Sequence, residues 1–246
     1  MSMSSRAFNM LAVMAVLWCA GCGNLPGRPI PSDIPIDPDN VSDFKVLFGT
    51  NCSGCHGANG KNGAALPIAD PVYLAIADDA RIRKVVTNGI PGTSMAAFAQ
   101  SAGGMLTEKQ VDVIVRGLRD HYAKPNVLAG SVAPPYAATE SGDAKRGAAV
   151  YQTFCASCHG ADGKGTPKGS SIVDGSFLAL LTDQELRTLV IVGRPDLGAP
   201  DWRNNVPGRP MSSQEISDVV AWLAAQRPSF PGSPYLNAAE STGEHP

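Results

Sequence analysis

The stretch "FCASCHGADGKG" at residues 154–165 sets two cysteines three positions apart and places a histidine directly after the second. Two thiols at this spacing can each add across a vinyl group of a haem, and the imidazole of the next residue then reaches the iron. The pattern Cys155-x-x-Cys158-His159 therefore predicts covalent attachment of a haem. Two other interpretations are a redox dithiol and half of a zinc site, which would need further cysteines or histidines at ligand spacing.

The same motif occurs earlier in the chain. "NCSGCHGANGKNG" carries Cys52, Cys55 and His56, and both motifs continue with His-Gly-Ala-(Asn/Asp)-Gly-Lys. The remaining histidines, His121 and His245, lie far from either motif in the sequence, so neither motif has nearby the extra ligands that a zinc site needs. The repetition favours two covalently bound haems over two dithiol or metal-binding loops.

Length and composition agree with two small domains. A chain of 246 residues forms one or two domains by length alone, and the repeated motif favours two. Units this short bury limited apolar surface, so a haem in each core would supply missing hydrophobic volume. The net charge is −2 and no basic run occurs, so we expect no nucleic-acid partner.

The N-terminus has the features of an export signal. An apolar run from Ala7 to about Ala20 follows a single Arg. It is too short for a comfortable membrane span and is typical of a secretory signal peptide. The run ends in Ala-Gly-Cys at Cys22, which resembles the bacterial lipoprotein processing site, although Cys19 stands where that site usually has Leu. We expect cleavage before Cys22 and a lipid on its sulfur; the alternative is an ordinary signal peptide with two incidental cysteines.

Proline-rich segments separate the repeated parts of the chain. Such segments form extended spacers, and the first of them would hold the protein a short way off a membrane. The expected organisation is a signal peptide (1–21), a Pro-rich tether (22–41), a first domain (42–123), a linker (124–140), a second domain (141–227) and a tail (228–246). The two domains are called the first copy and the second copy below.

Apolar residues spaced by three and four positions predict helices in both copies. "DPVYLAIADDARIRKVVTNG" matches "DGSFLALLTDQELRTLVIVG", and the two segments end at Gly89 and Gly193, which are good helix stops. The last helix of each copy begins with a capping box, in which Thr107 or Ser212 precedes Gln or Glu by three positions. No alternating strand pattern of useful length appears.

The order is short helix, Cys-x-x-Cys-His, loop, helix, Met-bearing loop and capped helix, which resembles a class I cytochrome c domain. The whole chain resembles a bacterial tandem dihaem cytochrome c over about residues 42–122 and 141–227. The resemblance implies an all-α fold of two class I cytochrome c domains, each a small helical domain around one covalent haem c. It also implies export, terminal helices that cross near the haem, and one-electron transfer without a substrate.

His56 and His159 would be the fifth ligands of the two irons. A thioether opposite histidine raises the potential by favouring Fe(II). In the first copy "NGIPGTSMAAFAQ" is similar to the family's sixth-ligand loop, so we expect Met95 to be the ligand and Met105 to be a packing or partly exposed residue. The backbone before Pro67 is expected to accept a hydrogen bond from the imidazole N–H of His56.

The sixth ligand of the second haem is less evident. Overlaying the copies puts Met95 onto Ala199, which cannot ligate, and Met211 is the only methionine after the second motif. Aligned on the capped helices, Met211 falls on Leu106, where a hydrophobic staple would explain it without iron. The loop from Ala199 to Met211 contains "NNVPGRP" and would allow the sulfur to fold inward, so we predict Met211 as the ligand. The alternative is a five-coordinate or water-bound haem.

Two further residues carry structural expectations. Trp222 resembles the family's aromatic residue at the helix crossing, and its counterpart in the first copy is Gly117, so we expect the first crossing to be less well packed. His121 ends the last helix of the first copy, where a cation suits the helix dipole.

The sequence therefore predicts a lipid-anchored electron carrier on the periplasmic side of a bacterial membrane, or the cytochrome subunit of a respiratory or photosynthetic complex. Its partners would be redox proteins or a membrane electron-transfer complex. Each copy is a minimal domain without an added catalytic segment, so we expect no enzyme activity. The alternatives are a dihaem peroxidase and a small-ligand sensor that uses an open second haem.

Overall fold

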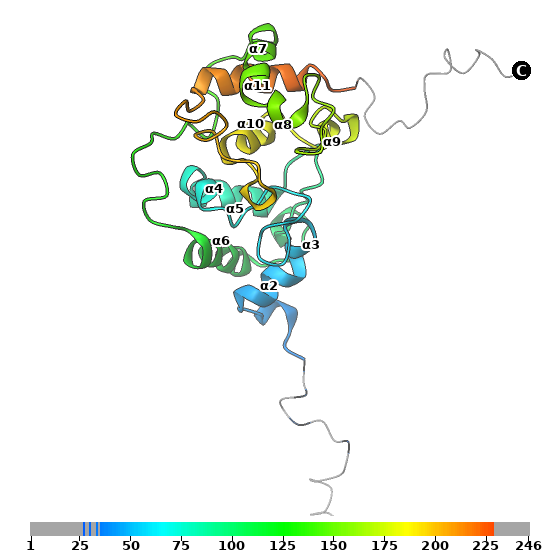
Figure 1. The fold of residues 1–246 in the computed structure, drawn as a ribbon. Coiled ribbons are helices and arrows are strands. Elements are labelled where there is room, and N and C mark those ends of the chain that lie inside the picture. The colour runs from blue at the N-terminus through cyan, green and yellow to red at the C-terminus, as the bar shows by residue number, and fades with distance from the viewer. Residues whose placement is uncertain (1–26, 28–29, 31–32, 34, 229–246) are drawn as a thin grey trace, which may run out of the picture. The chain divides into compact units, whose positions relative to one another are not determined.

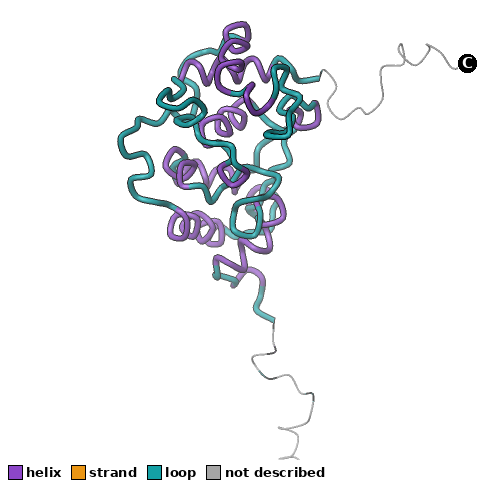
Figure 2. Tube along the Cα trace, in the orientation of Figure 1, coloured by secondary structure: helices purple, strands orange, loops and turns teal. Residues whose placement is uncertain are grey.

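The computed structural model describes residues 27, 30, 33 and 35–228. Within that part every regular element is a helix and no strand forms, apart from isolated bridges, which confirms the predicted all-α fold (Figure 2). No helix there is both long and apolar enough to cross a membrane. The predicted signal peptide, Cys22 and His245 lie outside the described residues.

The chain divides into residues 1–40 and 41–246 by its internal contacts. The first unit contains the described 3-10 helix η3 (Pro38–Asn40). The second unit holds both copies, and the first copy begins it (Figure 1). The elements of the first copy are α2 (Phe44–Asn51), α3 (Ser53–His56), α4 (Pro71–Ile76), α5 (Asp79–Asn88), η4 (Gln100–Ala102) and α6 (Glu108–Tyr122).

The second copy repeats this order. Its elements are α7 (Ala144–Phe154), α8 (Ala156–His159), α9 (Gly175–Ala179), α10 (Asp183–Val192), η5 (Pro195–Leu197) and α11 (Ser213–Ala224).

The helix starts follow the predicted capping chemistry. Thr107 accepts a hydrogen bond from the Gln110 N–H at 3.3 Å, and the Gln110 side chain accepts one from the Thr107 N–H at 3.0 Å. Ser212 and Glu215 form the same reciprocal pair at the start of α11. A third capping box at Thr182 starts α10. Each cap satisfies backbone N–H groups that the helix leaves unpaired, a contribution of about 1 kcal/mol.

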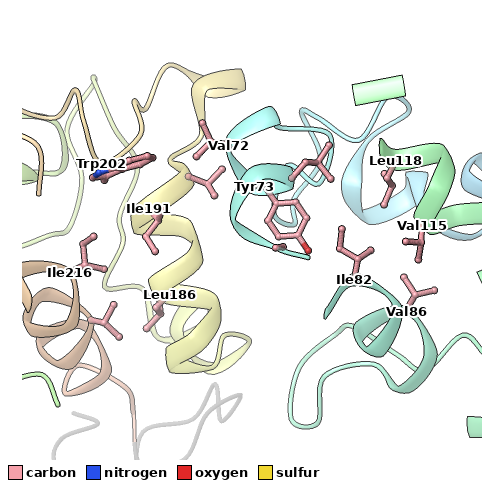
Figure 3. Close-up of a cluster of buried hydrophobic side chains, with 14 of the residues drawn as sticks. Val72, Tyr73, Ile82, Val86, Val115, Leu118, Leu186, Ile191, Trp202 and Ile216 are labelled. Atoms are coloured by element: carbon pink, nitrogen blue, oxygen red, sulfur yellow. The ribbon is translucent and has the colours of Figure 1, made fainter. Parts of the chain in front are cut away.

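The last helix of each copy buries the apolar stripe that its sequence predicts. Figure 3 shows side chains of α5, among them Ile82 and Val86, turned toward those of α6. Fully burying one such side chain stabilises a fold by about 1.5–3 kcal/mol. The buried stripe residues are Val111, Ile114, Val115 and Leu118 in α6, and Ile216, Val219, Val220 and Leu223 in α11.

In the second copy α7 and α11 cross at a glycine. A Cβ added to Gly147 would lie 2.0 Å from the backbone oxygen of Asp218 and 2.8 Å from the Cβ of Trp222. Only glycine therefore permits this close approach. The Trp222 ring stacks on Tyr151, with centroids 4.3 Å apart. The predicted place of Trp222 at the crossing is confirmed.

In the first copy the glycine lies on the last helix and the aromatic residue on the first helix, which is the reverse of the second copy. A Cβ added to Gly117 of α6 would lie 2.1 Å from a ring carbon of Phe44 in α2. Phe44 precedes Cys52 by the same number of residues as Gly147 precedes Cys155. The Phe44 ring also stacks on His121, with centroids 5.0 Å apart. The prediction that the first crossing is less well packed is confirmed, because α2 and α6 contact each other less extensively than α7 and α11 do, and Phe44 is only half-buried. The aromatic ring that the facing helix supplies was not predicted.

This reversed placement predicts compensation between two substitutions. Phe44→Gly removes a half-buried ring that packs against the core. It should lower the free energy of unfolding by about 2–3 kcal/mol, below the range for a fully buried Phe. Gly117→Trp overpacks the crossing and should cost about 1–3 kcal/mol or more. The double variant places the glycine and the aromatic residue as the second copy does. Its loss in free energy of unfolding should be at least about 1 kcal/mol smaller than the sum of the two single losses.

Denaturant unfolding of the four proteins in the double-mutant cycle measures this coupling. Val46→Gly is the matched control, because Val46 lies on the same helix and is 52% exposed. It should cost only about 0.5 kcal/mol of helix propensity. Strictly additive costs for Phe44→Gly and Gly117→Trp would contradict the account of the crossing.

Candidate haem-binding sites

Each cysteine motif forms one helical turn directly after the crossing helix. Cys52 is the C-cap of α2, and its carbonyl accepts the N–H groups of Cys55 and His56 at 3.3 and 3.0 Å. In the second copy the carbonyl of Cys155 accepts those of Cys158 and His159 at 3.1 and 3.0 Å. The two cysteines and the histidine of each motif are therefore held on one rigid turn, with matching backbone geometry in both copies.

The histidine rings are oriented by backbone carbonyls. The Nδ1 of His56 lies 2.8 Å from the Leu66 oxygen, and that of His159 lies 2.7 Å from the Ser170 oxygen. A carbonyl oxygen only accepts, so Nδ1 carries the proton and Nε2 keeps its lone pair for a metal. Leu66 precedes Pro67, so the predicted acceptor for His56 is confirmed. Ser170 is followed by serine, and no comparable signal marks it in the sequence.

The first cysteine of each motif is partly buried and the second is exposed. Burial, with a smaller contribution from Cys55, raises the pKa of Cys52 to about 12, and burial likewise raises the pKa of Cys155 to about 12. All four motif cysteines are free of disulfides. A redox dithiol works through a thiol of lowered pKa, and the raised pKa values of Cys52 and Cys155 are opposite to that requirement. Burial also lowers the pKa of His56, which favours the neutral imidazole that a metal requires.

The donor set fits a covalently held haem. Each motif offers two unpaired thiols and one imidazole whose Nε2 is free and whose ring is fixed by its Nδ1–H. Among the described residues no group of three or more His, Cys, Asp or Glu side chains gathers as a metal site. These residues can therefore form two thioether bonds and one axial bond in each copy.

The methionines lie in different settings. Met95 is half-buried, and its N–H donates to the Thr93 hydroxyl at 3.1 Å. Met105, the competing residue, is 73% exposed, which supports Met95 as the sixth ligand of the first haem. Met211 is buried, and Ala199 lies in the loop before it. The ligand roles of Met95 and Met211 stay predictions.

An ion pair of the second copy contacts the loop after the first haem motif. Arg194 pairs with Asp196 at 2.9 Å and donates to the Gly63 carbonyl at 2.8 Å. Asp196 in turn accepts a hydrogen bond from the Asn62 N–H at 2.8 Å. The hydrogen bonds from Arg194 hold the pKa of the Asp196 carboxyl below its usual value. Sequence patterns do not reveal this pair, because its role depends on a contact between residues far apart in the chain.

Two family models match separate parts of the chain. Residues 144–226 match the family described as cytochrome c, and residues 39–116 match the family described as cytochrome c oxidase, cbb3-type, subunit III. The chain therefore contains two cytochrome c domains in an all-α fold. Cytochrome c domains hold haem c covalently, which is the chemistry that the cysteine turns provide.

Curated relatives are named as subunits of a cbb3-type cytochrome c oxidase and of a cytochrome bc1 complex. The cbb3-type cytochrome c oxidase subunit CcoP of Azospirillum sp. is 32% identical over 132 residues, 49% of this chain and 40% of that protein. The cytochrome bc1 complex cytochrome c subunit of Mycobacterium tuberculosis is 27% identical over 185 residues, 73% of this chain and 61% of that protein. The chain thus spans about two fifths and three fifths of the length of these relatives.

A solved structure has a more distant likeness. A chain of a reducing HAO-like protein complex of Kuenenia stuttgartiensis has a TM-score of 0.45 at 17% identity, and the match covers 79% of this chain and 100% of that one. A likeness of this size has no bearing on function.

The paired cysteines predict how haem is distributed along the chain. Changing Cys52 and Cys55 together to Ala should remove one haem from the denatured polypeptide, and changing Cys155 and Cys158 should remove the other. Thioether bonds survive denaturation, so haem staining after denaturing electrophoresis measures the loss. Ser157→Ala, between the second pair of cysteines, is the control and should retain full staining. Loss of all colour from the unaltered chain after acid–organic extraction would contradict covalent attachment.

Proposed function

We propose that this protein is an exported cytochrome with two haem c groups that carries single electrons, as the cytochrome subunit of a respiratory complex or a tethered carrier beside one. The observation that carries this is the repeated turn in which two free thiols stand beside an imidazole with Nε2 available. The relatives named as oxidase and bc1 subunits support the respiratory setting.

The chain's own residues would hold each haem rather than react with a substrate. Cys52 and Cys55 in the first copy, and Cys155 and Cys158 in the second, would form the thioether bonds. His56 and His159 would be fixed as axial ligands by their carbonyl acceptors. When bound, haem c supplies reversible one-electron chemistry between Fe(III) and Fe(II), and the protein sets its potential through the axial ligands and their surroundings.

The contact between the copies supports electron exchange within the molecule. Arg194 and Asp196 belong to the loop of the second copy that corresponds to the Met95 loop, and they bond to Gly63 and the Asn62 N–H beside the first haem motif. Asp196 is 2% exposed in its side chain, so the pair is screened from solvent on that side. We propose that this pair keeps the two haem sites at a constant separation.

The carrier proposal is tested against the peroxidase alternative. The reduced holoprotein should transfer two electrons per chain to an oxidised soluble c-type cytochrome, as followed by stopped-flow absorbance, because each haem gives up one. It should show no sustained turnover of hydrogen peroxide when an electron donor is present in excess. Repeated peroxide turnover, with both haems still covalently bound, would favour the enzyme instead.

Met95 is proposed as the sixth ligand of the first haem. Met95→Ala should abolish the thioether-to-iron charge-transfer band of that haem and lower its potential, because a thioether favours Fe(II). Met105→Ala is the matched control and should leave both quantities unchanged, since Met105 lies at the surface. A charge-transfer band that survives Met95→Ala and disappears in Met105→Ala would reverse the assignment.

Membrane attachment is proposed through a lipid on Cys22. The proposal rests on the Ala-Gly-Cys sequence and the Pro-rich segment after it. Mass spectrometry of the mature N-terminal peptide should find a chain that begins at Cys22 and carries the mass of a diacylglyceryl group. Cys22→Ser should release the protein from the membrane fraction. A chain that starts elsewhere, unmodified and in the soluble periplasmic fraction, would exclude the anchor.

A further inference from the structure

The loops that follow α5 and α10 are closed by equivalent backbone hydrogen bonds. The N–H of Ile90 donates to the Met95 oxygen at 2.8 Å, and the N–H of Arg194 donates to the Ala199 oxygen at 2.9 Å. Each donor follows directly on the glycine that ends its helix. Ala199 therefore occupies the backbone position of Met95, and its methyl group has no atom that can bind iron.

The backbone also fixes Met211 in an equivalent position. Its N–H donates to the Trp202 oxygen at 2.9 Å, as the N–H of Leu106 donates to the Phe98 oxygen at 2.7 Å. Both residues immediately precede the N-cap of the last helix. Met211 is 3% exposed and Leu106 is 4% exposed. Met211 thus fills the core position that leucine fills in the first copy, where it has no role toward the iron.

The loop that carries Met211 is anchored along its length. It is one residue longer from Ala199 to Met211 than the loop from Met95 to Leu106. Arg203 pairs with Asp201 at 2.6 Å and donates to the Val127 carbonyl at 2.9 Å. This bonding opposes the inward folding that would bring the sulfur to the iron.

Side-chain contacts also hold the C-terminal end of this loop. Arg209 pairs with Glu215 at 2.7 Å, and its guanidinium lies 4.7 Å from the centre of the Phe154 ring. The Met211 sulfur lies 3.9 Å from the side-chain nitrogen of Asn205, which also donates to the Asp201 carbonyl at 3.2 Å. The thioether therefore has its polar neighbour within its own loop.

We propose that the second haem has no methionine opposite His159 and that this position takes a small neutral diatomic ligand of the class of carbon monoxide or nitric oxide. The inference rests on the proposed function, which attaches that haem to Cys155 and Cys158. It assigns different roles to two similar domains. Met95 would occupy the sixth coordination position of the first iron, whereas that position of the second iron would be free for a ligand because Ala199 stands in place of a methionine.

Carbon monoxide titration of the ferrous holoprotein tests the proposal. The unaltered protein should bind one carbon monoxide per two haems. Met211→Leu, which installs the residue of the first copy, should bind the same amount. Ala199→Met should lose the binding and gain a second thioether-to-iron charge-transfer band in the ferric state. Met95→Ala is the positive control and should raise the uptake to two per chain.

Several outcomes would overturn the inference. One is a ferrous protein with two covalent haems that takes up no carbon monoxide. Another is uptake at the second haem that appears only in Met211→Leu, which would make Met211 the ligand after all; this result does not depend on whether Ala199→Met folds. In both cases the covalent haems and the electron transfer would leave the proposed function intact. A chain without covalent haem would instead refute the proposed function, and the inference with it.

Discussion

The close crossing of the first and last helices is the constraint on which each domain depends. At the crossing, one helix presents a glycine and the other an aromatic residue. Gly117 faces Phe44 in the first copy, and Gly147 faces Trp222 in the second. The crossing helix runs directly into the cysteine turn, so its position sets where the thiols and the histidine lie. A substitution at the crossing should therefore disturb haem attachment as well as stability.

The two copies share the frame that would hold a haem and differ in what lies opposite the histidine. The cysteine turns and the Nδ1–H to carbonyl bonds agree closely between copies. The loops after α5 and α10 also close alike, yet one presents Met95 and the other Ala199. With this difference, the first haem would be suited to electron transfer and the second would be able to bind a ligand. The ion pair of Arg194 and Asp196 connects the second loop to the first haem motif.

Local patterns in the sequence predicted much of this, because they report local physics. The capping boxes, the apolar stripes of the last helices and the acceptor before Pro67 depend on residues near one another in the chain. The weaker packing of the first crossing was predicted from Gly117, but the contact with Phe44 was missed, since the two residues lie far apart in the sequence and Phe44 alone is not informative. The bonds from Arg194 to the first haem motif were missed for the same reason. Alignment of the two copies did place Ala199 on Met95. The structure adds that the carbonyls of both residues accept equivalent backbone hydrogen bonds.

The central claim is that each copy holds one haem and exchanges one electron. A coulometric titration of the purified protein, with visible spectra recorded at each potential, tests it most directly. The account predicts uptake of two electrons per chain in two one-electron steps, each accompanied by the spectral change of a c-type haem. A disulfide–dithiol couple in each motif would instead take up electrons in two-electron steps without a haem spectrum. That result would contradict the account, and so would uptake of only one electron per chain.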